Sequence, residues 1–258
     1  QMCKRLLSIS RQIFSIRVLY PIFDSLFIHD SYSCRRGKGT HAGVRRLEQY
    51  LCRASENYRQ PFYALKCDVK KFFDSISHSK LLELIQKRVD DLETVALVRQ
   101  IILSFQKTQG CGLPLGNVTS QLFANIYLNE LDQFIKHSLK ISYYLRYCDD
   151  FIILGSDSST LATLIPTIRS FLLDSLQLTL HPKKISIRKI STGIDFLGYV
   201  ILPHYQVVRT STCKRIFRKL SPPNKATKAT VNSYIGITTH AKGYLIKQRI
   251  LSLCAWDN

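Results

Sequence analysis

The chain has 258 residues, of which 45% are hydrophobic, and this content supports one large domain, or one domain with an appendage. Lys and Arg number 37 against 18 Asp and Glu, which gives a formal net charge of +19. Such an excess favours a polyanionic partner, most simply nucleic acid. A membrane-surface protein is the alternative, but no long basic amphipathic helix supports it. No apolar run reaches the roughly 20 residues that span a bilayer, so we expect no membrane partner.

Eight cysteines are scattered along the chain without a CxxC pair, so zinc-ribbon spacing is absent. They are typical of reduced, mostly buried thiols, and no signal-peptide pattern is visible, which together indicate a cytoplasmic protein. The chain opens with Gln1 inside a helical pattern, and we expect that residues precede it.

In chain order, apolar spacing first predicts a helix within residues 9–27. A loop rich in Gly, Ser and basic residues follows at 31–43, and Thr40 is a candidate cap for the next helix. The aromatic and apolar segment 61–69 predicts a strand.

The middle of the chain alternates between helical and strand patterns. Two amphipathic helices are predicted at 79–89 and 92–105, a Gly-rich loop at 109–120, a strong helix at 120–139 and a strand pair within 143–154.

The last third continues with a helix at 159–178, a basic strand at 183–191 and a further strand or hairpin arm at 193–203. A Pro- and Lys-rich linker at 221–230 precedes a helical tail from Val231. Strands interspersed with helices indicate an α+β or α/β sheet layered with helices on one face.

Two adjacent acids, Asp149 and Asp150, lie between apolar runs in "YYLRYCDDFIILGS". No glycine follows until Gly155, so ordinary turn formation explains the pair poorly, although an exposed hairpin tip remains an alternative. Asp68 ends the predicted strand 61–69. Carboxylates that separate strands bring to one sheet end form a site for Mg²⁺, which prefers oxygen ligands. Two such ions about 3.5–4 Å apart can drive phosphoryl displacement.

Five segments occur in the order of the reverse transcriptase motifs: "KCDVKKFFDSI", "GLPLGNVTSQLFANIYLNELD", "YYLRYCDDFIIL", "HPKKISI" and "GIDFLGYVI". Together they resemble the reverse transcriptase family from about Ser31 to Tyr199, and "YCDD" matches the YxDD box of that family. "LGNVTSQ" most resembles the reverse transcriptases of bacterial diversity-generating retroelements, because most other members carry QGxxxSP there.

The resemblance implies an α+β right-hand polymerase fold. Residues 1–66 would form part of the fingers, with the basic loop 31–43, and residues 67–220 the palm, an antiparallel ferredoxin-like sheet backed by helices. A fingers insertion would lie around 77–117, and residues 221–258 would be a linker and the start of a short helical thumb.

The resemblance also implies that Asp68 and Asp149 bind two catalytic Mg²⁺ ions, for which Mn²⁺ is a possible substitute. The carbonyl of Val69 would be a further ligand, and Asp150 would complete the acidic patch and coordinate the metal less directly. Metal coordination lowers the pKa of the primer 3′-hydroxyl. Lys184 would protonate the departing pyrophosphate, although Lys183 and Lys184 can equally be phosphate contacts or surface charges.

For the incoming nucleotide, the resemblance implies that the loop residues Arg35, Arg36 and Lys38 hold the triphosphate and the templating strand. A solvated basic loop is the alternative. Phe73 would be the steric gate that excludes a 2′-hydroxyl, unless it and Phe72 are core aromatics.

Leu115, Gly116 and Gln121 would flank the nucleotide pocket. Leu115 stands where most relatives have Gln, so the enzyme would discriminate less strictly against mismatched base pairs. The alternative is that Leu115 is a packing residue. Cys148 would border the primer end and the nucleotide. A zinc site of Cys67 and Cys148 is an alternative, although Cys67 should face the core.

The segment around Phe196, Leu197, Gly198 and Tyr199 resembles the primer grip, which would contact nucleic acid together with Lys183. An ordinary hydrophobic strand is the alternative.

The implied function is RNA-directed DNA synthesis, in which an RNA template is copied with errors from a DNA or RNA primer and dNTPs in a diversity-generating retroelement. A basic accessory protein and a bacterial, archaeal or phage origin would follow. Alternatives are a phage-defence, retron or group II intron reverse transcriptase, a silent RNA-binding palm and a nucleotide cyclase. The intact acids argue against the silent palm, because a binding module gains nothing from buried repelling carboxylates.

Overall fold

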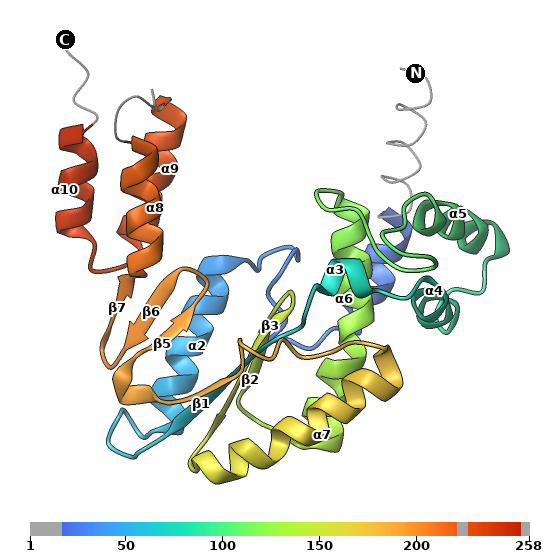
Figure 1. Ribbon diagram of the computed structural model, residues 1–258, viewed down its shortest axis with the longest axis horizontal. Helices are drawn as coiled ribbons and strands as arrows, with labels where there is room; N and C mark the ends of the chain where they lie inside the picture. Colours follow the sequence, from blue (N-terminus) through green and yellow to red (C-terminus); the bar gives the residue numbers. More distant parts are fainter. Residues whose placement is uncertain (1–16, 221–226, 254–258) are drawn as a thin grey trace.

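A computed structural model describes residues 17–220 and 227–253 (Figure 1). Residues 17–24 are helical, and the earlier part of the predicted first helix lies outside the described residues. The labelled α-helices of the described residues are α2 (Thr40–Ala54), α3 (Phe72–Ser75), α4 (His78–Gln86), α5 (Leu92–Leu103), α6 (Val118–Gln133), α7 (Ser158–Leu176), α8 (Thr210–Leu220), α9 (Lys228–Thr239) and α10 (Tyr244–Leu253). The strands are β1 (Tyr63–Asp68), β2 (Tyr144–Tyr147), β3 (Asp150–Gly155), β4 (Ser186–Lys189), β5 (Ile194–Phe196), β6 (Tyr199–Leu202) and β7 (Tyr205–Val208).

The central sheet has four antiparallel strands in the order β2-β3-β1-β4. Helix α6 lies between β1 and β2 in the chain, and α7 lies between β3 and β4. This βαββαβ arrangement is the predicted ferredoxin-like palm. A second sheet has the order β5-β6-β7.

The expectation that helices cover one face of the sheet is wrong, because both faces are covered. Leu65, Cys67 and Phe151 belong to the core that includes α6 and α7, whereas Ala64 and Ile152 belong to the core that includes α2 and the second sheet. Because successive side chains point to opposite faces, β3 needs apolar residues on both sides, which explains its continuous apolar run. The prediction that Cys67 faces the core is confirmed.

Helices α4 and α5 lie within the segment predicted as the fingers insertion, beside α3 and the upper end of α6 (Figure 1). The side chains of Ser77 and Asp91 cap them by accepting bonds from the amides of Lys80 and Thr94. The predicted helices in this region are therefore confirmed. Thr40, in contrast, is the first helical residue of α2, and Gly39 occupies the cap position.

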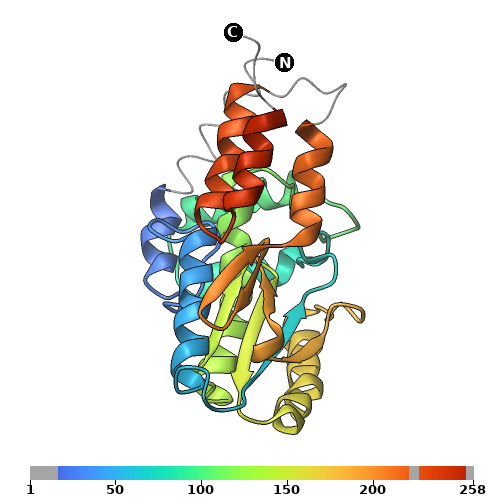
Figure 2. The same ribbon diagram turned by 90° about the vertical axis from the view of Figure 1, so that its left-hand side faces the viewer.

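Helices α8, α9 and α10 stand above the second sheet (Figure 2) and share a small core of Ile216, Leu220, Val231 and Ile250. Helix α8 therefore packs with the helices that follow it, although the predicted thumb segment begins at residue 221. The assignment of this unit as a thumb stays a prediction. The predicted boundary at residue 66 falls inside β1. Most of the predicted linker, residues 221–226, lies outside the described residues.

Within the described ranges 17–220 and 227–253, no helix has the length and apolar character needed to cross a bilayer.

Candidate active site

The connection between β2 and β3 is a two-residue turn formed by Cys148 and Asp149, because Tyr147 pairs with Asp150. Cys148 has a φ of 55° and so adopts the conformation that glycine usually supplies in such turns. The acidic pair is therefore divided: Asp149 lies in the turn and Asp150 begins β3. The expectation that turn formation explains this stretch poorly is wrong, since a cysteine takes the strained position.

The three acids meet at one end of the central sheet. Asp68 ends β1 directly opposite Asp150 on β3. The amide of Val69 donates to the carbonyl oxygen of Asp149 over 3.1 Å, which holds the turn against the end of β1. The assignment of the Val69 carbonyl as a metal ligand stays a prediction.

Two carboxyl groups in this cluster have raised pKa values. Burial, with a contribution from the neighbouring Asp68, raises the pKa of Asp149. Burial raises the pKa of Asp150 to about 6, although the nearby ammonium of Lys66 opposes the shift. Both residues therefore ionise less readily than an exposed aspartate.

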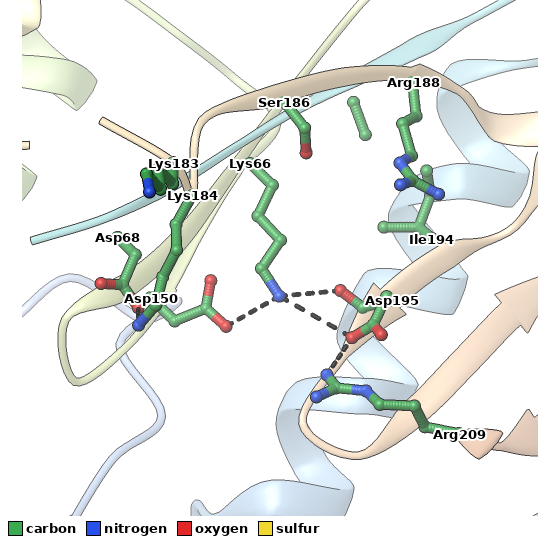
Figure 3. A pocket seen from close by; sticks show the side chains of 11 residues that line it. Lys66, Asp68, Asp150, Lys183, Lys184, Ser186, Arg188, Ile194, Asp195 and Arg209 are labelled. Atoms are coloured by element: carbon green, nitrogen blue, oxygen red, sulfur yellow. Dashed lines mark hydrogen bonds and ion pairs between the residues drawn. The ribbon is translucent and has the colours of Figure 1, made fainter. Parts of the chain in front are cut away.

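Two lysines provide counter-charges (Figure 3). The Lys184 Nζ lies 2.9 Å from Asp68 Oδ2, and this hydrogen bond raises the pKa of Lys184. The Lys66 Nζ lies 3.0 Å from Asp150 Oδ2 and donates to the carbonyl oxygen of Asp195 over 2.9 Å. Asp195 also pairs with Arg209. This network connects the acidic cluster to the second sheet along a pocket of about 440 Å³.

The donor set fits a hard divalent cation. Asp150 Oδ1 is a buried acceptor without a hydrogen-bond partner, and the convergent side-chain donors are carboxylate oxygens. In the part of the chain that the structure describes, no three His, Cys, Asp or Glu side chains are gathered closely enough to hold a metal. Lys184 and Lys66 instead form ion pairs with Asp68 and Asp150. A cation bound at Asp68 would therefore compete with Lys184.

The zinc alternative is disfavoured by the cysteines. Burial raises the pKa of Cys67 and of Cys148 to about 12. Among the described residues, neither cysteine belongs to a group of three His, Cys, Asp or Glu side chains that could hold a metal ion. Cys67 also belongs to the core on the α6 and α7 face of the sheet.

The basic loop presents its cations unequally. The Arg35 guanidinium turns into the fold, where it donates to Asp24 Oδ1 over 2.7 Å and to the carbonyl oxygen of Ile28 over 2.7 Å. Only 8% of its side chain is exposed. Arg36 is exposed and lies over the ring of Tyr20. Of the two arginines, only Arg36 is thus presented to solvent.

Lys38 belongs to the same loop and is half-buried. It donates to the carbonyl oxygen of His29 over 3.0 Å and lies over the ring of Tyr32. Burial and the nearby Arg35 lower its pKa. Its ammonium is therefore held near the loop, in a fixed direction.

The predicted nucleotide-pocket residues lie around α3 and the start of α6. Phe73 is half-buried, with its ring centroid 5.5 Å from that of Phe72. Leu115 is 76% exposed, so it is not a packing residue of the core. Gly116 is exposed with a φ of +89°, a conformation that favours glycine. Gln121 is half-buried in the first turns of α6.

The segment that resembles the primer grip is a hairpin rather than a single strand. Leu197 and Gly198 form its turn, with φ values of 50° and 90°. Phe196 and Tyr199 are 0% and 2% exposed, and the Tyr199 hydroxyl donates to the carbonyl oxygen of Ile237. The prediction that these two side chains contact nucleic acid is therefore corrected, because both pack in the core. Lys183 is exposed.

Sequence reasoning missed Lys66, Asp195 and Arg209. Lys66 was detectable, because a residue two positions before Asp68 on a strand points to the same face. Nothing in the sequence indicated that Asp195 and Arg209 would join it, since that contact depends on how the two sheets pack.

A family model for reverse transcriptase (RNA-dependent DNA polymerase) matches residues 6–201, a range that contains all three acids. The chain belongs to the reverse transcriptase family. It is 24% identical to protein YkfC of Escherichia coli over 72% of this chain and 58% of that protein. It is also 24% identical to the group II intron-encoded protein LtrA of Lactococcus lactis, over 84% of this chain and 45% of that one.

Further matches are to a fungal intron protein and to a solved telomerase structure. An uncharacterized 91 kDa protein in the cob intron of Schizosaccharomyces pombe is 30% identical over 46% of this chain and 15% of that protein. Apo telomerase from Candida tropicalis superposes with a TM-score of 0.60 at 17% identity, covering 76% of this chain and 45% of that one. The latter match shows the right-hand polymerase fold alone.

Proposed function

We propose that the chain is an RNA-directed DNA polymerase, which adds deoxynucleotides to a primer 3′-hydroxyl on an RNA template. The observation that supports this most directly is the strand register, which places Asp68 opposite Asp150 and leaves Asp149 in the adjoining turn. A silent RNA-binding palm would not need three carboxyl groups in a site where burial raises the pKa of two of them.

Asp68 and Asp149, with the carbonyl of Val69, would hold two Mg²⁺ ions, or Mn²⁺ in their place. Bound there, the cations would lower the pKa of the primer 3′-hydroxyl and neutralise phosphate charge. Asp150, paired with Lys66, would complete the acidic patch beside these ligands and coordinate less directly. Lys184 is protonated at neutral pH and is assigned the proton transfer to the departing pyrophosphate.

The nucleotide would enter between the basic loop and α3. Arg36 and Lys38 are assigned to the triphosphate, while Arg35 supports the loop from inside. Phe73 is assigned the exclusion of the 2′-hydroxyl, and Cys148 borders the primer end. Leu115, Gly116 and Gln121 would line the pocket. Leu115 cannot donate or accept a hydrogen bond, which fits error-prone copying.

The net charge of +19 fits a template–primer duplex as the substrate. The hairpin turn at Leu197 and Gly198, the exposed Lys183 and the thumb unit are assigned to it. A basic accessory protein is a further proposed partner, and the cytoplasm of a bacterium, an archaeon or a phage-infected cell is the proposed location.

Two observations favour two different types of retroelement. The segment "LGNVTSQ" favours a diversity-generating reverse transcriptase that copies adenines with errors. The match to LtrA favours a group II intron type. Sequencing of the cDNA made on a template of mixed composition separates them, because only the first type should misincorporate mainly opposite template adenines.

The proposed activity is tested by extension of a primer on a homopolymer RNA with Mg²⁺. We expect extension by the wild type and a loss of at least about a thousandfold for Asp149→Asn, because a metal ligand is removed. Asp174→Asn, on α7, is the matched control and should extend normally. Equal extension by the wild type and Asp149→Asn would reject the proposal.

A further inference from the structure

Behind the turn that carries Asp149, the structure buries a charged pair. Arg146 on β2 and Asp132 on α6 are both 0% exposed. The Arg146 Nε donates to Asp132 Oδ1 over 2.8 Å and its Nη2 donates to Oδ2 over 2.6 Å, a bidentate arrangement. Apolar replacement of both members of such a pair is often neutral for stability, so stability alone does not explain why the pair is there.

The other donors of Arg146 indicate a second role. Its Nη1 donates to Asn125 Oδ1 over 3.3 Å and to the carbonyl oxygen of Cys148 over 3.0 Å, and its Nη2 donates to Ser31 Oγ over 3.1 Å. A guanidinium has five N–H groups, and with the two bonds to Asp132 each of them has an acceptor. One of these acceptors belongs to the active-site turn itself.

That bond acts on a strained position. The φ of Cys148 is 55°, a conformation that is costly for a residue with a side chain. The Cys148 carbonyl belongs to the peptide group that precedes Asp149, and the carbonyl of Asp149 accepts from the Val69 amide. The peptide groups on both sides of Asp149 are therefore held, one of them by Arg146.

The same residue joins the turn to the start of the basic loop. The Arg146 amide donates to the carbonyl oxygen of Asp30, and the Tyr32 amide donates to the carbonyl oxygen of Arg146, both over 2.9 Å. Asn125 Nδ2 donates to the carbonyl oxygen of Ser33 over 2.8 Å. Because β2 is an edge strand, these bonds satisfy its free side.

We propose that Arg146 is a positioning residue that fixes the peptide plane between Cys148 and Asp149, and so sets the direction of the Asp149 carboxylate relative to the basic loop. Its link to nucleotidyl transfer rests on the proposed function. Its effect on the turn does not, and the two are measured separately.

The test is Arg146→Lys in the full chain. Lysine keeps the charge opposite Asp132, but three donors on one atom cannot serve acceptors spread around a planar fork. We expect a melting temperature within a few degrees of the wild type. Without metal, the amides of residues 147–150 should exchange with deuterium at least about tenfold faster. The kcat of primer extension should fall about 10- to 100-fold, with the KM for dNTP within about twofold.

Tyr144→Phe is the matched control. The Tyr144 hydroxyl donates to Asp132 Oδ1 over 2.6 Å, so this variant removes a bond of the same network without touching the turn. We expect wild-type exchange at residues 147–150 and wild-type kcat, whatever the change in melting temperature.

Wild-type exchange and wild-type kcat in Arg146→Lys would overturn the proposal. If that variant does not fold, the pair Arg146→Met with Asp132→Leu, which leaves no buried charge unpaired, decides by the same measurements. If the wild type has no polymerase activity, the proposed function is rejected, but the positioning role is not. In that case the exchange measurement decides alone. Faster exchange at residues 147–150 in Arg146→Lys would support the positioning role, and unchanged exchange would overturn it.

Discussion

Asp150 shows at the scale of one residue how the site is electrostatically prepared for a cation. Burial raises its pKa from an ordinary 3.8 to about 6, even with Lys66 at 3.0 Å. The folded state therefore binds this proton more tightly than the unfolded chain does. By linkage, the metal-free protein loses stability as the pH rises from about 4 to about 6.

We expect this loss to be on the order of 3 kcal/mol when complete. Asp150→Asn, which does not ionise, should flatten the pH dependence of the melting temperature in that window. Adding Mg²⁺ at pH 7 should raise the melting temperature of the wild type more than that of the variant. Parallel pH profiles of the two proteins would contradict the assignment.

Phe73 is the residue whose role can be tested by the sugar of the nucleotide. It is half-buried against Phe72, so the structure leaves part of its ring available at the surface. Phe73→Ala should raise ribonucleotide incorporation at least about tenfold, since a steric clash is removed. Single-nucleotide extension with dNTP and rNTP measures this, and Phe73→Tyr should keep the discrimination. Unchanged discrimination in the alanine variant would remove the gate.

At the scale of elements, the sequence predicts strands and helices well where one pattern dominates. The apolar run of β3 and the helical spacing of α6 both identify their elements, because burial imposes those patterns. The turns are predicted less well. Cys148 and Leu197 take positive φ values that sequence rules reserve for Gly and Asn, so only the pairing of the flanking strands reveals them.

The hairpin turn at Gly198 gives a test of this reading. Its φ is 90°, so Gly198→Ala should destabilise the fold by about 1–2 kcal/mol, although a Cβ there would meet only Thr212 Oγ1 at 3.6 Å. Gly236→Ala is the matched control, because a Cβ in that helix meets nothing within 4 Å. It should stabilise by about 0.5–1 kcal/mol. Denaturant unfolding measures both, and equal effects would contradict the backbone argument.

For the whole molecule, the order of motifs along the chain predicts which acids converge, and the sheet register confirms that Asp68 lies opposite Asp150. It does not predict the packing between the two sheets, which buries Phe196 and Tyr199 and brings Asp195 to Lys66. Nor does it predict that α8 packs with the helices that follow it. Contacts of this kind depend on three-dimensional packing rather than on local pattern.

The central claim is that the convergent acids hold the cations that drive nucleotidyl transfer. Metal rescue of Asp149→Cys tests it most directly, because thiolate is a poor ligand for Mg²⁺ and a good one for softer ions such as Cd²⁺. We expect primer extension by this variant to be lost in Mg²⁺ and partly restored by Cd²⁺, with no such gain for the wild type or for Asp149→Ala. Wild-type extension by Asp149→Cys in Mg²⁺ would contradict the account.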